Sequence, residues 1–266
     1  MNIENDKILE QYKMVLPEVQ EFYCDHSQSE FEKAFGITSV DYINRRPHYL
    51  IRIIPSKYSD NLLSKGEIRM GSLDYYRNME FNNDGRADVS EGAVTILQSG
   101  QILIGNPPVK ISEGRTTVYQ YSNNVNNGYV YCLYGCYENI YDGKIHSIDI
   151  PDQMNNMGES KILIFNPGEF VNRCAKAAKE QGYTLVRGAV NYYDDKTSNL
   201  KWHPFMKPES YRYQSEYRLY CPTADSSDSS IILNIGPIYD IAIIIDDPMF
   251  LVPVDKGKLE IRKMRL

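Results

Sequence analysis

Apolar residues near the N-terminus recur mostly at helical intervals. Residues 5–23 carry this pattern, and Pro17 interrupts it. A period close to 3.6 residues is typical of an amphipathic helix, and a proline ends or kinks one. A second short helix is expected at residues 29–35, where Gly36 provides a natural stop. The pattern therefore predicts a helical extension over residues 1–44.

From residue 48 onward the apolar positions fall in short runs that are rich in β-branched and aromatic residues. Glycine, asparagine and proline separate the runs, as they do in antiparallel sheets. The expected strands cover residues 48–54, 67–71, 93–104, 116–121, 128–137, 144–150, 161–166, 183–192, 216–221, 230–235 and 238–245. Those between residues 93 and 150 predict an antiparallel meander. Two helices are expected among the strands, at residues 57–64 and 167–181.

The order of these elements predicts an α+β fold built mainly of antiparallel sheets. Two sheets packed around a cleft are one arrangement that this order allows. A polar, turn-rich segment at residues 80–91 is expected to be a loop. Because no repeat and no long linker divides residues 45–266, we expect one α+β domain there, following the N-terminal helical extension.

Composition narrows the class of protein. The chain has 266 residues and a formal net charge of -6, and a charged fraction of 24% argues against disorder of the whole chain. No apolar run approaches the roughly 18 residues of a membrane span, and the N-terminal sequence has no apolar signal region. Five cysteines, an odd number, favour reduced thiols. We therefore expect a cytoplasmic protein with no membrane partner.

Tyrosine dominates the aromatic residues, with 22 copies against 8 phenylalanines and 1 tryptophan. Its apolar ring and polar end suit both ligand sites and protein interfaces. Tyr129, Tyr131, Tyr134 and Tyr137 mostly alternate in a predicted hairpin, a pattern typical of a sheet surface or an interface. The sequence therefore predicts a protein partner through the region from Tyr129 to Tyr137.

The common metal and nucleotide motifs are missing from the sequence. Cys132 and Cys136 have no second Cys or His pair at zinc spacing, so we interpret them as small core residues. Asp88 and Glu91 are expected to form a local ion-pair loop with Arg86 rather than a metal site. There is no phosphate-binding P-loop, no GlyXSerXGly elbow and no GlyXGlyXXGly turn. We therefore expect no metal cofactor.

Two segments in the first third of the chain carry residue types that bind phosphate. Arg52 lies in the strand expected at residues 48–54, where a partly exposed arginine that packs its stem is the plainer interpretation. Residues 66–77 read GEIRMGSLDYYR and contribute Arg69, Ser72, Tyr75 and Tyr76. Arginine forks beside tyrosine rings can bind a phosphate and stack on an aromatic ring.

A third segment, residues 205–220, reads FMKPESYRYQSEYRLY. If it is extended, Gln214, Glu216 and Arg218 share one face, where an amide, a carboxylate and a guanidinium can meet one ligand. An amphipathic edge strand with its polar face in solvent explains the same pattern. Both interpretations stay open at this point.

The three segments together resemble an uncharacterised bacterial family. Its members share a tyrosine-rich opening of strand, helix, Gly and Ser, and a late motif of Phe, Lys, Tyr, Glu, Tyr and Arg. The matching stretches here are HYLIRIIP, NLLSKGEIRMGSLDYYR and FMKPESYRYQSEYRL. More remotely, the layout resembles ADP-ribosyltransferases, which bind NAD in a cleft between two antiparallel sheets.

The resemblance implies a role for each matching residue. Arg52 corresponds to the strand arginine that holds the NAD phosphates, Ser72 to the serine of the second motif, and Gln214 with Glu216 to the GlnXGlu pair. Arg69 is a rival phosphate ligand, because one branch places its arginine after the first helix. In this scheme Glu216 stabilises the developing positive charge on the ribose, Gln214 addresses the acceptor, and no metal takes part. Tyr75 or Tyr76 would stack on the nicotinamide.

Three classes of function follow. The first is an NAD-dependent ADP-ribosyltransferase that modifies a protein or nucleic-acid acceptor, for which the resemblance implies a toxin or phage-defence context. The second is a non-enzymatic interaction or inhibitor protein with a tyrosine-rich surface. The third is a protein that acts on nucleic acid, which the net charge of -6 disfavours. The first class predicts that Arg52 or Arg69, Tyr75 and Glu216 line one concave pocket.

Overall fold

A central antiparallel sheet organises the protein. The computed structural model describes residues 14–15, 47–79, 86–104, 106–121, 127–137, 144, 146–194, 196, 200–223, 228–245, 249–254 and 258–263. Within these residues the sheet has eight strands in the order β14-β3-β6-β2-β8-β15, with β13 beside β6 and β9 beside β13. They are β2 (Tyr49–Ile54), β3 (Glu67–Ser72), β6 (Gly128–Cys136), β8 (Ser160–Ile164), β9 (Val186–Ala189), β13 (Glu216–Pro222), β14 (Ser230–Asn234) and β15 (Ala242–Ile245).

Strand β6 is the centre of this sheet, and two strands share one of its edges. On one edge β13 pairs with β6 along almost its whole length. On the other edge β3 pairs only with Tyr129 and Val130, and β2 pairs only with residues 134–136. Within the described part of the chain, no strand pairs with residues 131–133 on that edge. The backbone ladder is therefore interrupted between β2 and β3, and the candidate site lies at this interruption.

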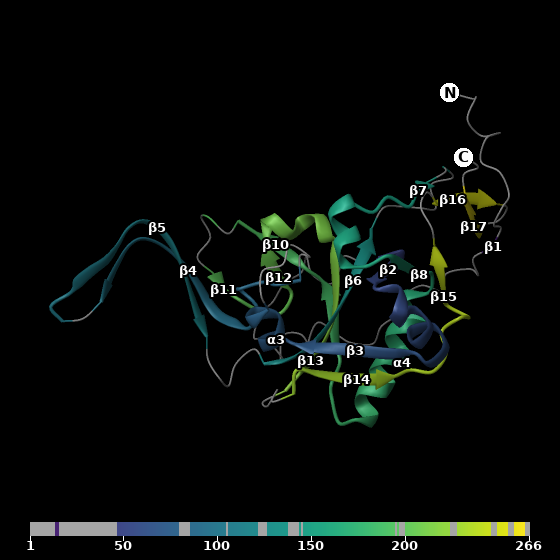
Figure 1. Cartoon of the computed structure of the whole chain (residues 1–266), viewed down its shortest axis with the longest axis horizontal. Coiled ribbons are helices and arrows are strands. Elements are labelled where there is room, and N and C mark those ends of the chain that lie inside the picture. The colour runs from purple at the N-terminus through teal and green to yellow at the C-terminus, as the bar shows by residue number, and fades with distance from the viewer. Residues whose placement is uncertain are drawn as a thin grey trace.

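Smaller sheets flank the central one. Strands β1 (Met14–Val15), β17 (Lys258–Lys263), β16 (Met249–Val254) and β7 (His146–Ser147) form one, and β10 (Asn191–Tyr193) pairs in parallel with β12 (Met206–Pro208). The long hairpin of β4 (Ala93–Ile104) and β5 (Val109–Tyr121) joins β11 (Leu200–Lys201) and extends away from the rest of the molecule (Figure 1). The root of this hairpin adjoins the site, because β4 begins directly after residues 86–92.

Among the described residues, helices are few and short except for α4 (Pro167–Glu180). Asn166 caps it, since its side chain accepts a hydrogen bond from the Glu169 N–H at 3.1 Å, and Pro167 occupies the first turn. The remaining helical segments are η2 (Ser56–Tyr58), η3 (Asn61–Lys65), α3 (Leu73–Asn78), η4 (Asp152–Met157) and η5 (Glu209–Gln214). Gly66 ends η3 with φ of 64°, and a Cβ there would lie 2.0 Å from the carbonyl oxygen of Gly236.

The core fills both faces of the central sheet. On one face Phe170, Val171 and Cys174 of α4 pack against alternate residues of β2 and β8, among them Leu50 and Ile162. On the other face the side chains of β2 and β8 that point the opposite way pack against buried residues of the sheet formed by β16 and β17. A third cluster, which includes Trp202 and Phe205, lies at the root of the β4–β5 hairpin. Because β2 is buried on both faces, a polar residue within it needs a partner.

The structure confirms the predicted α+β class, and it corrects several details. The β4–β5 hairpin forms as expected, but the meander prediction is wrong beyond it, because β6 crosses into the central sheet. Of the predicted helical extension, Met14 and Val15 form a strand that pairs with Glu260 and Ile261, and the rest of residues 1–44 lies outside the described residues. The pattern also missed α3, β16 and β17.

Two further findings concern the described residues alone. None of their helices combines the length and the apolar character that crossing a membrane requires. Among these residues, Cys132, Cys136, Cys174 and Cys221 form no disulfide with one another.

Candidate functional site

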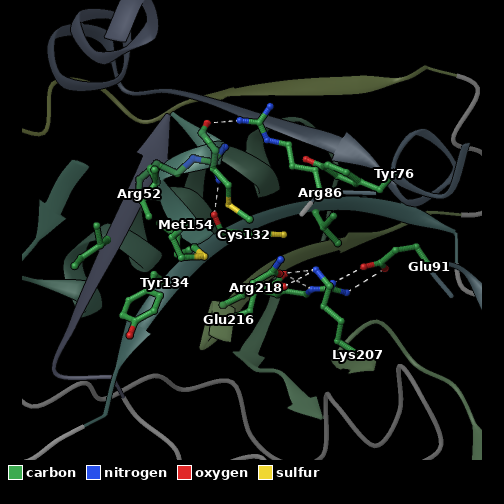
Figure 2. A pocket seen from close by; sticks show the side chains of 16 residues that line it. Arg52, Tyr76, Arg86, Glu91, Cys132, Tyr134, Met154, Lys207, Glu216 and Arg218 are labelled. Atoms are coloured by element: carbon green, nitrogen blue, oxygen red, sulfur yellow. Dashed lines mark hydrogen bonds and ion pairs between the residues drawn. The ribbon is translucent and has the colours of Figure 1, made fainter. Parts of the chain in front are cut away.

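A pocket opens at the interruption between β2 and β3. Side chains from β2, β6, β12, β13, α3, η4 and residues 86–91 line it, and its cavity volume is about 70 Å³. A cavity needs about 10 to 15 Å³ to hold one water molecule, so this one accommodates several waters or one small chemical group. We call Glu91, Lys207, Glu216 and Arg218 the floor of the pocket, and Arg52, Tyr76 and Arg86 its rim (Figure 2).

Glu216 is the centre of the floor. It is the first residue of β13 and is only 4% exposed. Its Oε1 accepts a hydrogen bond from Arg218 Nε at 2.6 Å, and its Oε2 accepts one from Lys207 Nζ at 3.0 Å. Burial by itself would raise the pKa of Glu216, but the charges of Arg218 and Lys207 outweigh it and hold the pKa well below its usual range. Glu216 is therefore a carboxylate at neutral pH.

Arg218 joins a second carboxylate to the floor. Its two terminal nitrogens donate to the two carboxylate oxygens of Glu91, and one of them also donates to the Pro204 carbonyl at 2.6 Å. Arg218 is 1% exposed, so this ion pair is buried. Burial raises the pKa of Glu91 to about 7, since Arg218, which also binds Glu216, offsets only part of the cost of desolvation. One guanidinium thus holds two carboxylates whose pKa values are shifted in opposite directions.

Lys207 links the floor to Gln214. Its ammonium donates to Gln214 Oε1 at 2.7 Å and lies 4.6 Å from the ring centre of Tyr211. Gln214 belongs to η5, and the backbone turns sharply at Ser215, whose φ is 40°. The expectation that Gln214, Glu216 and Arg218 lie on one continuous strand is therefore wrong for Gln214. Lys207 nevertheless brings the Gln214 side chain close to Glu216, because its ammonium donates a hydrogen bond to each of them.

Arg52 forms the rim where β2 leaves β6. Its NH1 donates to the carbonyl oxygen of Cys132 at 2.5 Å, and its guanidinium lies 4.3 Å from the ring centre of Tyr131. The interrupted ladder explains this contact, because the Cys132 carbonyl has no strand partner on that edge and needs a donor. The Nε atom of Arg52 is buried and has no hydrogen-bond partner. A ligand with an acceptor atom would satisfy this N–H.

Tyr76 and Arg86 complete the rim. The ring of Tyr76 lies against β3 at Gly71, where a Cβ would come within 2.7 Å of the ring carbon Cε2. Arg86 donates to the carbonyl oxygen of Met157 in η4. Burial raises the pKa of Tyr76, and the charges of Arg52 and Arg86 both oppose this shift. Both guanidinium groups therefore lie close enough to the Tyr76 hydroxyl to stabilise negative charge there.

The charge balance of the lining favours an anionic ligand. Four cationic side chains line the pocket against two carboxylates, which leaves a surplus of two positive charges. Lys207 and Arg218 contact the carboxylates directly, whereas Arg52 contacts a carbonyl oxygen and an aromatic ring. Ile51, Ile53, Met154 and Met157 add an apolar wall. The pocket thus combines an apolar surface with a cationic one, as a nucleotide-like ligand requires.

The predicted site residues divide into two groups. Arg52, Tyr76, Gln214 and Glu216 come together in the pocket from three distant parts of the chain. Arg69, Ser72 and Tyr75 do not line it. Arg69 is exposed and donates to Ser230 Oγ at 3.1 Å, and the Ser72 hydroxyl caps α3 by accepting from the Tyr75 N–H at 3.1 Å. Tyr75 lies on the exposed face of α3, so Tyr76 takes the position expected for a pocket tyrosine.

Sequence reasoning missed Arg86, Glu91 and Lys207 as lining residues of the pocket. The predicted local ion-pair loop of Arg86, Asp88 and Glu91 is wrong, because Glu91 binds Arg218 and Asp88 accepts hydrogen bonds from Ser90. Lys207 was present in the quoted motif, but it was not interpreted as a site residue, and the structure buries it. Contacts across 127 residues, such as the one between Glu91 and Arg218, leave no signal in one sequence.

The tyrosines of β6 are mostly structural. Tyr129 and Tyr131 are each 3% exposed and belong to the core. Tyr134 and Tyr137 are partly exposed, and Tyr134 lines the candidate pocket. The region from Tyr129 to Tyr137 is thus a central strand rather than an open sheet surface, and a protein partner there stays a prediction that rests on its last two tyrosines.

Among the described residues, no three His, Cys, Asp or Glu side chains are grouped to bind a metal ion. No protein-family model, no curated protein and no solved structure matches the chain.

Proposed function

We propose that this protein is an NAD-dependent ADP-ribosyltransferase that modifies a macromolecular acceptor, as a toxin or an antiviral-defence effector does. The observation that carries the proposal is the convergence of Arg52, Tyr76, Gln214 and Glu216 in one pocket. These residues come from β2, α3 and the adjacent segments η5 and β13, so three separate parts of the chain meet in the pocket. The resemblance to ADP-ribosyltransferases assigns the phosphate, the nicotinamide and the reacting ribose to these same residues.

The proposed reaction breaks the bond between the nicotinamide nitrogen and the ribose C1′. The bonding electron pair leaves with nicotinamide, and the ribose passes through an oxocarbenium-like transition state. A nucleophilic atom of the acceptor then bonds to C1′ and loses its proton. Glu216 suits this step because Lys207 and Arg218 keep it ionised, and a fixed negative charge in a water-poor site stabilises the developing positive charge.

Glu216 also retains capacity to bind a substrate hydroxyl. An ionised carboxylate offers roughly four lone-pair positions. Hydrogen bonds from Arg218 and Lys207 use two of them. Glu216 lines the pocket, so a ribose hydroxyl can donate to a remaining position.

The size of the cavity limits how NAD binds. About 70 Å³ is enough for one end of the molecule and too little for the whole dinucleotide. We infer that the nicotinamide end enters between the apolar wall and Tyr76, and that the phosphates lie at the rim beside Arg52. The positive charge of Arg52 and its unpaired Nε–H both favour a phosphate oxygen at this position.

The test is incubation of the purified protein with NAD labelled in its ADP-ribose moiety and with cell extract. Wild type should transfer label, and Glu216→Gln should lower the rate about 100-fold or more. Glu209→Gln is the matched control, because Glu209 belongs to the same segment but is exposed and pairs with Arg212. Thermal melting checks that each variant is folded, and Arg52→Gln provides a second variant outside the buried floor.

The outcomes separate the three classes of function. Protease or nuclease treatment of the labelled product shows whether the acceptor is protein or nucleic acid. If folded wild type neither transfers label nor consumes NAD, the transferase proposal is wrong, and the interaction protein becomes the better hypothesis. Equal labelling by wild type and Glu216→Gln would assign the chemistry to another residue.

A further inference from the structure

We propose that Arg86 and Tyr76 form, together with Arg52, a subsite for the pyrophosphate of the substrate. Arg86 thus takes the role of phosphate ligand that the resemblance implied for Arg69. The inference rests on the proposed function, because it specifies how the same pocket holds a dinucleotide. It goes beyond that function by naming Arg86, which the sequence did not offer as a ligand, and by giving the Tyr76 hydroxyl a role in phosphate binding besides the stacking role that the resemblance implies for a tyrosine ring.

Three side chains from separate elements meet at the rim. Arg52 comes from β2, Tyr76 from α3 and Arg86 from the segment that leads into β4, and all three line one pocket (Figure 2). The charges of both arginines also act on the Tyr76 hydroxyl, since both lower its pKa against the effect of burial. Arg69 lies on the exposed side of β3 and bonds Ser230 instead.

The arginines of the floor and of the rim differ in how many of their N–H groups are already bonded. Arg218 directs four of its N–H groups to Glu216, Glu91 and Pro204, and it is 1% exposed. It therefore has almost no capacity left for a ligand. Arg52 uses one N–H for the Cys132 carbonyl and leaves its buried Nε unsatisfied. A ligand anion is consequently expected at the rim and not at the floor.

The geometry of a pyrophosphate suits such a rim. Two linked phosphates present oxygens on several sides, and guanidinium groups approaching from separate elements can each bind one phosphate with a planar fork. The phenol hydroxyl of Tyr76 adds a neutral donor in the same pocket. Close contact with Gly71, where there is no room for a Cβ, restricts the position of the Tyr76 ring. The subsite is thus formed before the ligand arrives.

Calorimetric titration with ADP-ribose, ADP and AMP tests the inference without requiring catalysis. Arg86→Gln should weaken the binding of ADP-ribose and ADP by about 10- to 100-fold, which is the usual effect of losing hydrogen bonds to a charged group. The binding of AMP, which has a single phosphate, should weaken less. Tyr76→Phe, which removes only the hydroxyl, should weaken ADP-ribose binding by a few-fold. Arg69→Gln is the matched control and should bind all three as wild type does.

The results distinguish this inference from the proposed function. If Arg86→Gln is folded and binds ADP-ribose like wild type, or if Arg69→Gln shows the larger loss, the subsite is wrong even when NAD is cleaved normally. If ADP-ribose binding depends on Arg86 while NAD is never cleaved, the subsite stands and the transferase proposal fails. If Arg86→Gln does not fold, Arg86→Lys replaces it in the test. This variant keeps the charge but loses the planar fork, so its binding of ADP-ribose and ADP should weaken in the same way but by a smaller factor.

Discussion

At the floor of the pocket, each charged group faces a partner of opposite charge, and Glu91, Lys207, Glu216 and Arg218 are all nearly inaccessible to solvent. At the rim, Arg52 meets a carbonyl and a ring and keeps one buried N–H unsatisfied. The floor therefore fixes the position of Glu216, while the rim has binding capacity left. The most heavily bonded charges in a site therefore need not be those that contact a ligand. Three variants test this contrast between floor and rim.

The largest effect is expected from Arg218→Leu. This variant leaves two buried carboxylates without their shared cation, and removal of one partner from a buried ion pair costs about 3 to 5 kcal/mol. Urea denaturation should show this loss in the free energy of unfolding. Arg52→Gln is the comparison at the rim, where we expect a change within about 1 kcal/mol, because the variant also removes an unsatisfied N–H. Equal losses in the two variants would contradict the division into floor and rim.

A smaller effect should appear in the pH dependence of stability. The pKa of Glu91 is raised to about 7 in the folded protein from an ordinary value of 4.5. The folded state therefore keeps this proton where the unfolded state has lost it. The contribution of Glu91 to the free energy of unfolding is fully present below about pH 4.5 and declines as the pH rises to about 7. The contribution of Glu216 has the opposite pH dependence, because its lowered pKa adds stability that is lost as the pH falls below 4.5.

Glu91→Gln isolates the first of these contributions. It mimics the protonated acid, so its stability relative to wild type should increase between pH 4.5 and 7, by on the order of 1 to 3 kcal/mol. Urea denaturation at a series of pH values measures this difference. The pH dependence of wild type alone does not isolate Glu91. Burial lowers the pKa of His203 from 6.5 to about 4, so this residue adds stability as the pH rises through that range, whereas Glu91 loses it. A constant difference between the two proteins would contradict the assignment to Glu91.

A modest change in stability, together with a change in binding, is expected from Gly71→Ala. The new Cβ would lie 2.7 Å from the Tyr76 ring and displace it, at a cost of about 1 to 3 kcal/mol. Gly135→Ala is a close control, because its Cβ would meet the ring of Tyr137 at 2.8 Å or less, outside this pocket. Stability should fall in both variants, but ADP-ribose binding only in Gly71→Ala. Unchanged binding there would mean that the position of Tyr76 does not matter.

Much of the fold could be predicted because its signals are local. Asn166 and Pro167 mark the start of α4, and the apolar runs of β2, β6 and β13 match their buried strands. Short amphipathic signals were weaker. The six residues of α3 follow directly after a strand, and a capping serine was interpreted as a ligand for NAD.

The site was only half predictable for a related reason. Arg52 and Glu216 belong to strands that can be recognised from the sequence, so their side chains could be proposed as partners. Arg86 and Glu91 lie in a turn-rich segment whose position depends on contacts with Met157 and Arg218. No periodicity describes such contacts, because they join residues 71 and 127 positions apart.

The interrupted edge of β6 has a consequence for how this site can evolve. Arg52 is held in place by a main-chain carbonyl, which every residue at position 132 provides. Replacement of Cys132 by another small side chain therefore leaves that anchor intact. The width of the opening is likewise set by where β2 and β3 pair with β6, not by the side chains inside it. Because Ile51, Ile53 and Met154 of the wall belong to the core, only substitutions that keep the core packed can change which ligand is accepted, while the arginine that receives the ligand keeps its place.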